Sequence, residues 1–285
     1  MVESKRPVDV FVDVLIHVVI VIACFLCLIP LLNTLALSFS SSVMASSGTV
    51  SFWPKQFTLA AYEAIVGEKQ FFGAFWISIK RVVLGGTINF LMMVLCAFPL
   101  AHSEKAFRGR NVYMYFLIFT MLFSGGLVPT YIIVGKMGLM NTLWALILPG
   151  AVPVWNCILL MNFFRSLPDE LEEAAIIDGA VPIQILVRIY LPGSLPSLAT
   201  VMLFCLVGHW NEFFSGLIYM NHSDNYPLAT YISTIVDSAK DLNLITDPEE
   251  IERIMKVSER NMSSAKIFVS MIPILIIYPF LQGIS

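Results

Sequence analysis

Hydrophobic residues in this sequence form long continuous runs instead of an alternating pattern. A helix needs about 20 apolar residues to cross a bilayer core about 30 Å thick. Runs of this length predict membrane-spanning helices in six places, at residues 14–37, 75–101, 112–134, 142–164, 194–219 and 262–281. Strands of a membrane barrel alternate in polarity and are only about 10 residues long, so the pattern favours an all-α membrane protein.

The positions of lysine and arginine predict an orientation for the six spans. Lys5 and Arg6 precede the first span, and Lys105, Arg108 and Arg110 crowd the connection between the second and third. Cytoplasmic loops of membrane proteins are enriched in these two residue types. We therefore expect a cytoplasmic N-terminus over 1–13, a transmembrane domain over 14–285 and an extracytoplasmic loop over 220–261.

The first span also has features of a secretion signal, because a basic pair precedes its apolar residues. Its apolar stretch runs from about Val10 to Leu37, interrupted only by Asp13 and His17. The apolar part of a signal peptide is about 7–15 residues long. We therefore interpret the segment as a retained membrane helix.

One amphipathic helix is expected inside the 220–261 loop. Asp247, Pro248 and Glu250 resemble a helix start, with proline at the first helical position. Leu244, Ile251 and Ile254 follow helical spacing.

Glycine and proline are predicted to interrupt several spans. Pro30 lies in the first span and Gly85-Gly86 in the second. Gly125-Gly126 and Pro129 lie in the third span, and Pro149 and Pro153 in the fourth. Breaks of this kind are tolerated where neighbouring helices or a cavity satisfy the freed backbone groups. Two interpretations stay open, namely bent helices lining a pathway or ordinary helix packing.

Composition agrees with the membrane class. Of the 285 residues, 58% are hydrophobic and 13% are charged, against about 45–50% and about 25% in soluble domains. The net charge of −3 offers no basic surplus for nucleic acid. The five cysteines, Cys24, Cys27, Cys96, Cys157 and Cys205, all lie in apolar runs. We interpret them as packing or lipid-facing side chains instead of redox or metal sites.

Motifs of soluble enzymes are missing from the sequence. There is no G-x-x-x-x-G-K-[ST] phosphate loop, so we do not expect this chain to bind ATP in the usual way. The four histidines lack metal-ligand spacing, and His209 beside Trp210 is interpreted as a packing or pathway residue. We therefore predict no catalytic residue and no metal site.

A polar segment of distinct composition connects the fourth and fifth spans, over residues 165–192. Pro168 followed by Asp169 and Glu170 predicts a helix start, with acids where the helix dipole favours them. Small residues then predict a thin helix face that another protein can approach closely, and Gly179 is expected to end the helix.

This segment resembles a known family motif. The pattern Glu173-Ala174-Ala175-x-x-Asp178-Gly179-Ala180, followed by Leu191-Pro192, is similar to the EAA loop of permease subunits in binding-protein-dependent ABC importers. The flanking LPDELEEAA and LPGSLPSLAT resemble the maltose-type, carbohydrate-importing branch. Three further segments resemble the branch that imports complex oligosaccharides: residues 125–156, HWNEFFSGLIY and IPILIIYPFLQ. The resemblance as a whole runs from about residue 70 onward.

The resemblance implies a fold and a mechanism. The fold is the type I ABC importer permease fold, with six transmembrane helices and a cytoplasmic coupling helix, in the bacterial inner membrane. The chain would form half of a carbohydrate pathway that works by alternating access. The coupling residues implied by the motif are Glu172, Glu173, Ala174, Ala175, Asp178, Gly179, Ala180, Leu191 and Pro192.

The resemblance also implies partners and the place of ATP hydrolysis. The partners would be a second, different permease, two ATP-binding subunits and an extracellular solute-binding protein. ATP and Mg would bind to the ATP-binding subunits, with no cofactor and no enzymatic activity in this chain. Related permeases usually continue with a basic tail, whereas this sequence stops at Ser285.

Polar side chains inside the predicted spans are candidates for a substrate path, because such groups are costly in a membrane. The candidates are Asn89, Trp155, Asn156, Trp210, Asn211 and Glu212. Hydrogen bonding between helices is the competing explanation. Lys80 and Arg81, near the outer end of the second span, are interpreted as cations that reach the membrane interface.

Two alternatives to a sugar permease remain. The EAA loop is shared by importers of other solutes, so the same architecture with a non-sugar cargo is one alternative. A membrane receptor or enzyme is the other. An intramembrane enzyme should place reactive groups on facing helices, and a receptor should carry a cytoplasmic effector domain. Neither such a group of reactive residues nor such a domain is recognisable in the sequence.

Overall fold

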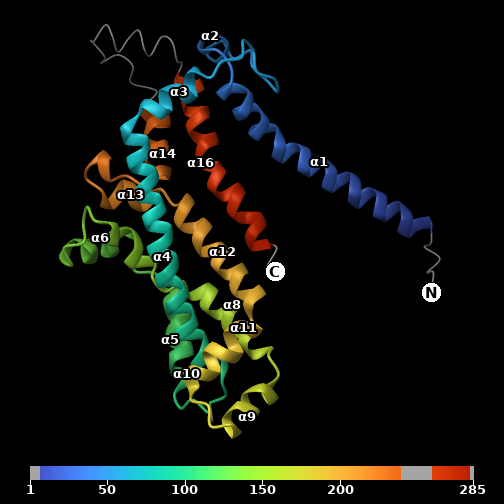
Figure 1. The fold of residues 1–285 in the computed structure, drawn as a ribbon, viewed down its shortest axis with the longest axis vertical. Helices are drawn as coiled ribbons and strands as arrows, with labels where there is room; N and C mark the ends of the chain where they lie inside the picture. The colour runs from blue at the N-terminus through green and yellow to red at the C-terminus, as the bar shows by residue number, and fades with distance from the viewer. Residues whose placement is uncertain (1–6, 105, 239–258, 283–285) are drawn as a thin grey trace. The chain divides into compact units, whose positions relative to one another are not determined.

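The computed structural model describes residues 7–104, 106–238 and 259–282, and these contain helices and no strand. Figure 1 shows the helices in chain order. Two compact units are present: residues 1–68 with 235–271, and residues 69–234 with 272–285. The amphipathic helix expected at 244–254 lies outside the described residues.

The first unit contains α1 (Pro7–Ser38), α2 (Ser42–Ser46), α3 (Ala60–Gly67) and much of α16 (Glu259–Gln282). Polar contacts join these elements at one end of α1. Asn33 Nδ2 donates to the Ser51 carbonyl at 2.8 Å. The Lys266 ammonium of α16 lies 2.7 Å from a Glu68 carboxylate oxygen, beside the end of α3.

The second unit is built around α4 (Lys69–Ala101), which packs along α8 (Val154–Arg165) and α12 (Leu195–Asn211). Fully buried apolar side chains from all three helices form its core, including Met93, Ala97, Leu160, Phe164 and Val201. This three-helix core fixes the positions of the polar residues discussed below.

Several of the predicted breaks are present. α5 (Arg110–Leu122) and α6 (Leu127–Lys136) meet at 111°, and Gly126 between them has φ +86°. α7 (Leu143–Ile147) with the 3₁₀ turn η1 (Leu148–Gly150) bends by 49° against α8. The breaks predicted at Gly125-Gly126 and Pro153 are therefore confirmed.

Two other predicted breaks are wrong. Pro30 lies inside a continuous α1, and Gly85-Gly86 lie inside a continuous α4. The two glycines instead let α12 approach closely. A Cβ added at Gly85 would lie 2.6 Å from His209 Nε2, and one at Gly86 would lie 2.6 Å from Leu206 Cδ2.

The remaining elements of the second unit are short. After α9 (Asp169–Ile177), the chain forms α10 (Pro182–Ile185), the π-helical turn η2 (Leu186–Tyr190) and α11 (Leu191–Gly193), and this series bends by 85° into α12. α13 (Phe214–Tyr219), η3 (Ser223–Asn225) and α14 (Leu228–Ser238) follow α12.

In the described helices, membrane-spanning potential is found for up to five of the six predicted runs. Among the described helices, Phe11–Ser38 of α1 and Lys69–Ala101 of α4 are long and apolar enough to cross a membrane. Counting each of the three bent pairs as one span raises the number to five, by length and composition. The last predicted run, 262–281, lies within α16.

Candidate functional site

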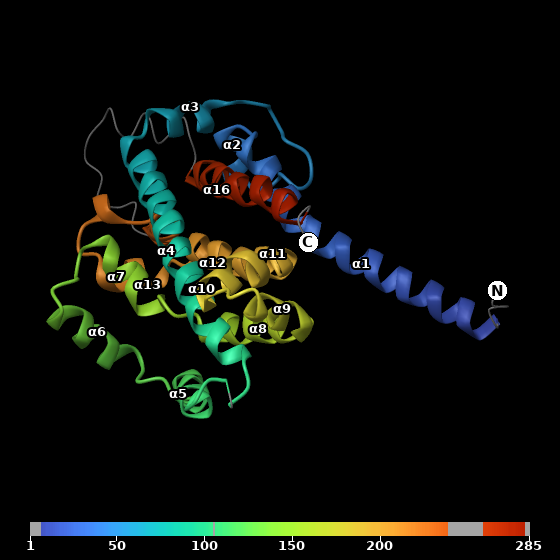
Figure 2. The ribbon, with the colours of Figure 1, turned by 60° about the horizontal axis from the view of Figure 1, so that its bottom comes forward.

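The segment between α8 and α12 forms a separate short helix, as the sequence predicts. α9 begins at Asp169 directly after Pro168 and ends at Ile177. Gly179 has φ +79°, and the Ala180 amide returns to the Ala175 carbonyl at 2.9 Å. This left-handed glycine ends the helix in the expected way. α9 lies at the extreme end of the second unit in Figure 1, and Figure 2 brings that end forward.

The two faces of α9 differ in exposure. Glu172 and Ala175 are half-buried, and Ala175 and Ala180 pack against the apolar core. Glu173 and Ala174 are exposed, and the Ile177 side chain is 86% exposed. Ile176 beside it is 56% exposed, so the two side chains leave an apolar patch of the kind that marks a protein contact. The sequence interpretation missed Ile177, although its apolar side chain beside the EAA pattern was a usable signal.

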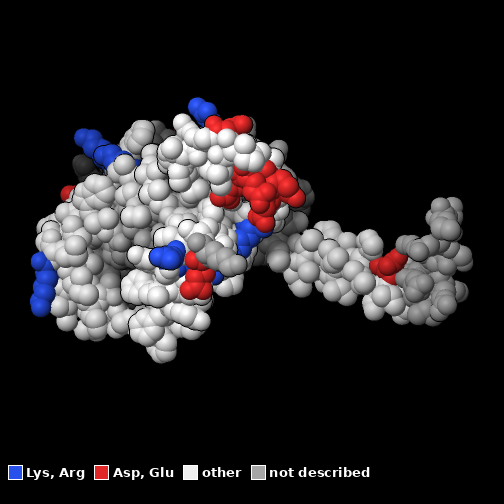
Figure 3. All heavy atoms as spheres, turned by 90° about the horizontal axis from the view of Figure 1, so that it is seen from below, with Lys and Arg blue, Asp and Glu red and all other residues white. Residues whose placement is uncertain are grey.

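Acidic side chains gather at this end of the molecule. Seen from below, one group of carboxylates is larger than the others (Figure 3). The α9 segment contains Asp169, Glu170, Glu172, Glu173 and Asp178, and all of these except Glu172 are exposed. Three of the acids lie in the first helical turn, where the helix dipole stabilises negative charge. The outer face of α9 therefore presents small, apolar and acidic side chains together.

Within this acidic segment, Glu172 has partners from other elements. Its Oε1 lies 2.8 Å from His102 Nε2, just beyond the end of α4. Its Oε2 accepts a hydrogen bond from the Tyr190 hydroxyl of η2 at 2.5 Å. Of the two later motif residues, Leu191 is half-buried at the start of α11 and Pro192 is exposed.

Three of the candidate path residues are buried between helices. Asn89 donates to the Gly150 and Ala151 carbonyls, both at 2.9 Å, and its Oδ1 lies 2.7 Å from His209 Nε2. Asn156 donates to Cys205 Sγ at 3.1 Å. Trp210 is buried and meets Phe75 edge to face at 5.8 Å. For these three residues the geometry favours the interhelical explanation.

The other three candidates are accessible. The Trp155 side chain is 62% exposed, and Asn211 is also exposed. The Glu212 side chain is 37% exposed and follows the last residue of α12. These residues lie at the N-terminus of α8 and at the C-terminus of α12.

Arg81 differs from its predicted role. Its side chain is only 3% exposed, and its Nη2 lies 2.5 Å from Glu212 Oε2. Nη1 donates to the Glu212 carbonyl at 2.9 Å, and Nη2 also donates to Ser215 Oγ at 3.0 Å. The prediction that Arg81 reaches the membrane interface is therefore wrong. The sequence contains a signal for this ion pair, because Arg81 and Glu212 are opposite charges that each lie within an apolar run.

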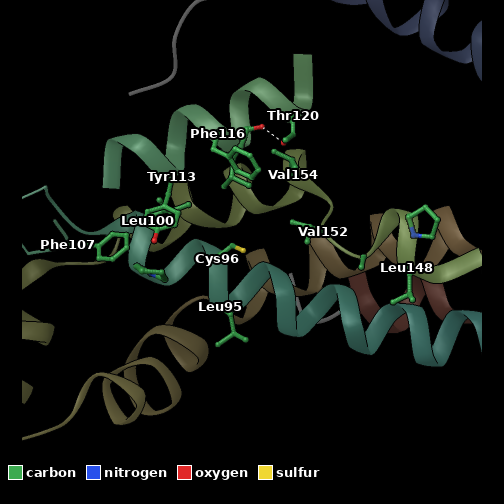
Figure 4. Close-up of a pocket in the computed structure, with 14 residues that line it drawn as sticks. Leu95, Cys96, Leu100, Phe107, Tyr113, Phe116, Thr120, Leu148, Val152 and Val154 are labelled. Atoms are coloured by element: carbon green, nitrogen blue, oxygen red, sulfur yellow. Dashed lines mark hydrogen bonds between the residues drawn. The ribbon is translucent and has the colours of Figure 1, made fainter. Parts of the chain in front are cut away.

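A cavity of about 690 Å³ lies between α4, α5 and the connection from η1 to α8 (Figure 4). Its lining is mostly apolar, including Leu95, Cys96, Phe116 and Val152. The hydroxyl of Thr120, also in the lining, donates to the Leu117 carbonyl at 2.8 Å. The cavity thus suits hydrocarbon and offers little for a sugar to hydrogen-bond. In the described residues, no group of three or more His, Cys, Asp or Glu could hold a metal ion.

Comparison with known proteins gives consistent results. Residues 71–285 match the family described as binding-protein-dependent transport system inner membrane component. Protein LplC of Bacillus subtilis is 38% identical over 255 residues, covering 90% of this chain and 85% of LplC. The polygalacturonan/rhamnogalacturonan transport system permease protein YtcP of the same species is 34% identical, covering 95% and 93%.

Two further similarities, at lower sequence identity, are also to carbohydrate transport proteins. The arabinooligosaccharides transport system permease protein AraQ of Halalkalibacterium halodurans is 29% identical, covering 81% of this chain and 84% of AraQ. Among solved structures, a chain of a bacterial ABC transporter involved in the import of the acidic polysaccharide alginate is similar, with a TM-score of 0.87 and 27% identity. That similarity covers 98% of both chains.

Proposed function

Because the chain belongs to the family of inner-membrane components of binding-protein-dependent transport systems, we propose that it forms half of the membrane pathway of an ATP-driven carbohydrate importer. The observation that carries this function is the exposed face of α9 on a permease fold. That face combines Glu173, Ala174 and Ile177 at the end of the second unit. A rigid helix with such a face fits a groove on a motor subunit.

The cargo we propose is an oligosaccharide. YtcP is named for polygalacturonan and rhamnogalacturonan, and AraQ for arabinooligosaccharides. The similar solved structure belongs to an alginate importer. These three names share a chain of sugars as cargo, which supports a sugar over an amino acid or phosphate.

The proposed assembly contains a second, different permease, two ATP-binding subunits that bind ATP and Mg, and an extracellular solute-binding protein. The N-terminus and α9 then face the cytoplasm. The cations Lys5, Arg6, Arg108 and Arg110 support this orientation. The acidic outer face of α9 would meet a groove that carries basic side chains.

Purification of tagged assemblies from membranes tests the docking function. Glu173→Ala removes an exposed carboxylate from α9. We expect recovery of the ATP-binding subunits to fall about tenfold, because truncating an important interface side chain costs more than about 1 kcal/mol and about 1.4 kcal/mol is tenfold in affinity. Glu63→Ala, an exposed glutamate of α3, is the matched control. Equal recovery for the two variants would contradict the proposed docking face.

Uptake tests the cargo. Proteoliposomes containing the complete assembly and its binding protein should accumulate labelled oligosaccharides, with oligogalacturonides and arabinooligosaccharides as the first two substrates. Uptake of amino acids or phosphate in place of any sugar would replace the proposed cargo with a non-sugar solute.

A further inference from the structure

Glu172 and Glu173 are neighbours in the EAA segment but lie in different surroundings. Glu173 is exposed, whereas only 20% of the Glu172 side chain is exposed. Glu172 bonds to His102, just after α4, and to Tyr190 in η2. One carboxylate therefore connects α9 to two parts of the helical core.

Both ring nitrogens of His102 lie within hydrogen-bond distance of an oxygen atom. Nδ1 of His102 lies 2.8 Å from the Phe98 carbonyl, which only accepts hydrogen bonds. On the other side of the ring, Nε2 faces Oε1 of Glu172 at 2.8 Å. A hydrogen bond to a carboxylate is about twice as strong as one between neutral groups.

Aromatic packing holds the two partners of Glu172 in place. The His102 ring meets Phe98 edge to face at 4.8 Å. Tyr190 packs edge to face against Phe98 at 5.1 Å and against Phe164 of α8 at 5.3 Å. The Tyr190 and Phe164 side chains are buried in the core. Close packing of this kind transmits displacement with little loss.

The end of α4 is also fixed from two other sides. Arg110 Nε of α5 donates to the Leu100 carbonyl at 2.9 Å. Arg165, at the end of α8, donates to the Leu100 and Ala101 carbonyls, both at 3.2 Å. These cations satisfy carbonyls that a helix end leaves open. The last turn of α4 is thereby joined to α5, α8 and, through His102, α9.

We propose that Glu172 is a positioning residue that transmits movement of α9 to the end of α4 and to η2, and is not itself a contact with the ATP-binding subunit. This inference rests on the proposed function, because it assumes that a motor subunit displaces α9. It assigns different roles to two adjacent glutamates: Glu173 docks, and Glu172 passes the displacement inward.

A glutamine pair separates the two roles. Glu172→Gln keeps the side-chain shape but removes the charge, and Glu173→Gln makes the same change on the outer face. We expect Glu172→Gln assemblies to retain the ATP-binding subunits and ATP hydrolysis, while solute uptake falls about tenfold. ATP hydrolysed per solute imported therefore rises about tenfold. Glu173→Gln should instead reduce subunit recovery.

Three outcomes overturn the inference. Unchanged ATP consumption per solute would show that Glu172 transmits nothing. Loss of the ATP-binding subunits in a folded Glu172→Gln chain would make Glu172 a docking residue. If Glu172→Gln does not fold, Tyr190→Phe replaces it, because this variant removes one hydroxyl and keeps the ring. We then expect the ATP hydrolysed per solute imported to rise about threefold, and no increase would overturn the proposal. A failure of Glu173→Gln to affect recovery would count against the docking function alone.

Discussion

At the residue scale, the ion pair between Arg81 and Glu212 shows how charge is accommodated among apolar helices. Arg81 makes contacts with the Glu212 carboxylate, the Glu212 carbonyl and Ser215. The hydroxyl of Ser215 also donates to the same carboxylate. The two charges therefore share the Ser215 hydroxyl as a partner, and the contribution of one residue depends on the presence of the other.

Removing one member of this pair should be more damaging than removing both. Arg81→Met leaves the carboxylate without its cation, and we expect the free energy of unfolding to fall by about 1–3 kcal/mol, because Glu212 is 37% exposed and keeps its hydrogen bonds to Ser215. The double variant Arg81→Met with Glu212→Gln should recover most of that loss, because neither charge remains. Thermal unfolding in detergent measures both. Strictly additive effects in the double variant would contradict a direct coupling.

At the element scale, the helix breakers show what sequence reasoning reached and where it stopped. The bends at Gly126 and Pro153 were predictable, because glycine-proline clusters favour interruption. Gly85-Gly86 gave the same local signal, yet the helix continues. The difference lies in His209 and Leu206 of α12, more than a hundred residues later in the sequence. Local composition holds no information about such a distant neighbour.

Alanine substitutions within α4 test this close approach. Gly85→Ala places a methyl group 2.6 Å from the His209 ring, so we expect a loss of about 1–3 kcal/mol in stability. Gly73→Ala is the control in the same helix, because nothing lies within 4 Å of its added Cβ. Helix propensity should make that variant neutral or slightly more stable. Equal melting temperatures for the two variants would contradict the packing described.

At the scale of the whole molecule, the sequence predicted the class, the apolar runs and the segment that forms α9. Long charge-poor runs and the positions of Pro168 and Gly179 were sufficient for this. The bend angles and the partners of Glu172 were not predictable. They depend on the distant residues His102 and Tyr190, which no sequence period connects to Glu172.

The orientation of the chain is a further whole-molecule prediction. We expect cysteine placed at Glu170 in α9 to react with a membrane-impermeant thiol reagent only after cells are opened. Cysteine placed at Glu63 in α3 should react in intact cells. Both positions are exposed, so the side of the membrane and not burial decides the labelling. The opposite pattern would reverse the topology derived from lysine and arginine.

The absence of side chains at Gly85 and Gly86 has a consequence for how the molecule changes shape. Ring and methyl groups of α12 fill the grooves that these glycines leave on α4. Sliding one helix along the other would drive those groups into backbone, so the two helices are expected to travel as a single rigid body. Deformation during a transport cycle then concentrates at the hinges, where the bends between α5 and α6 and between α7 and α8 already interrupt the backbone.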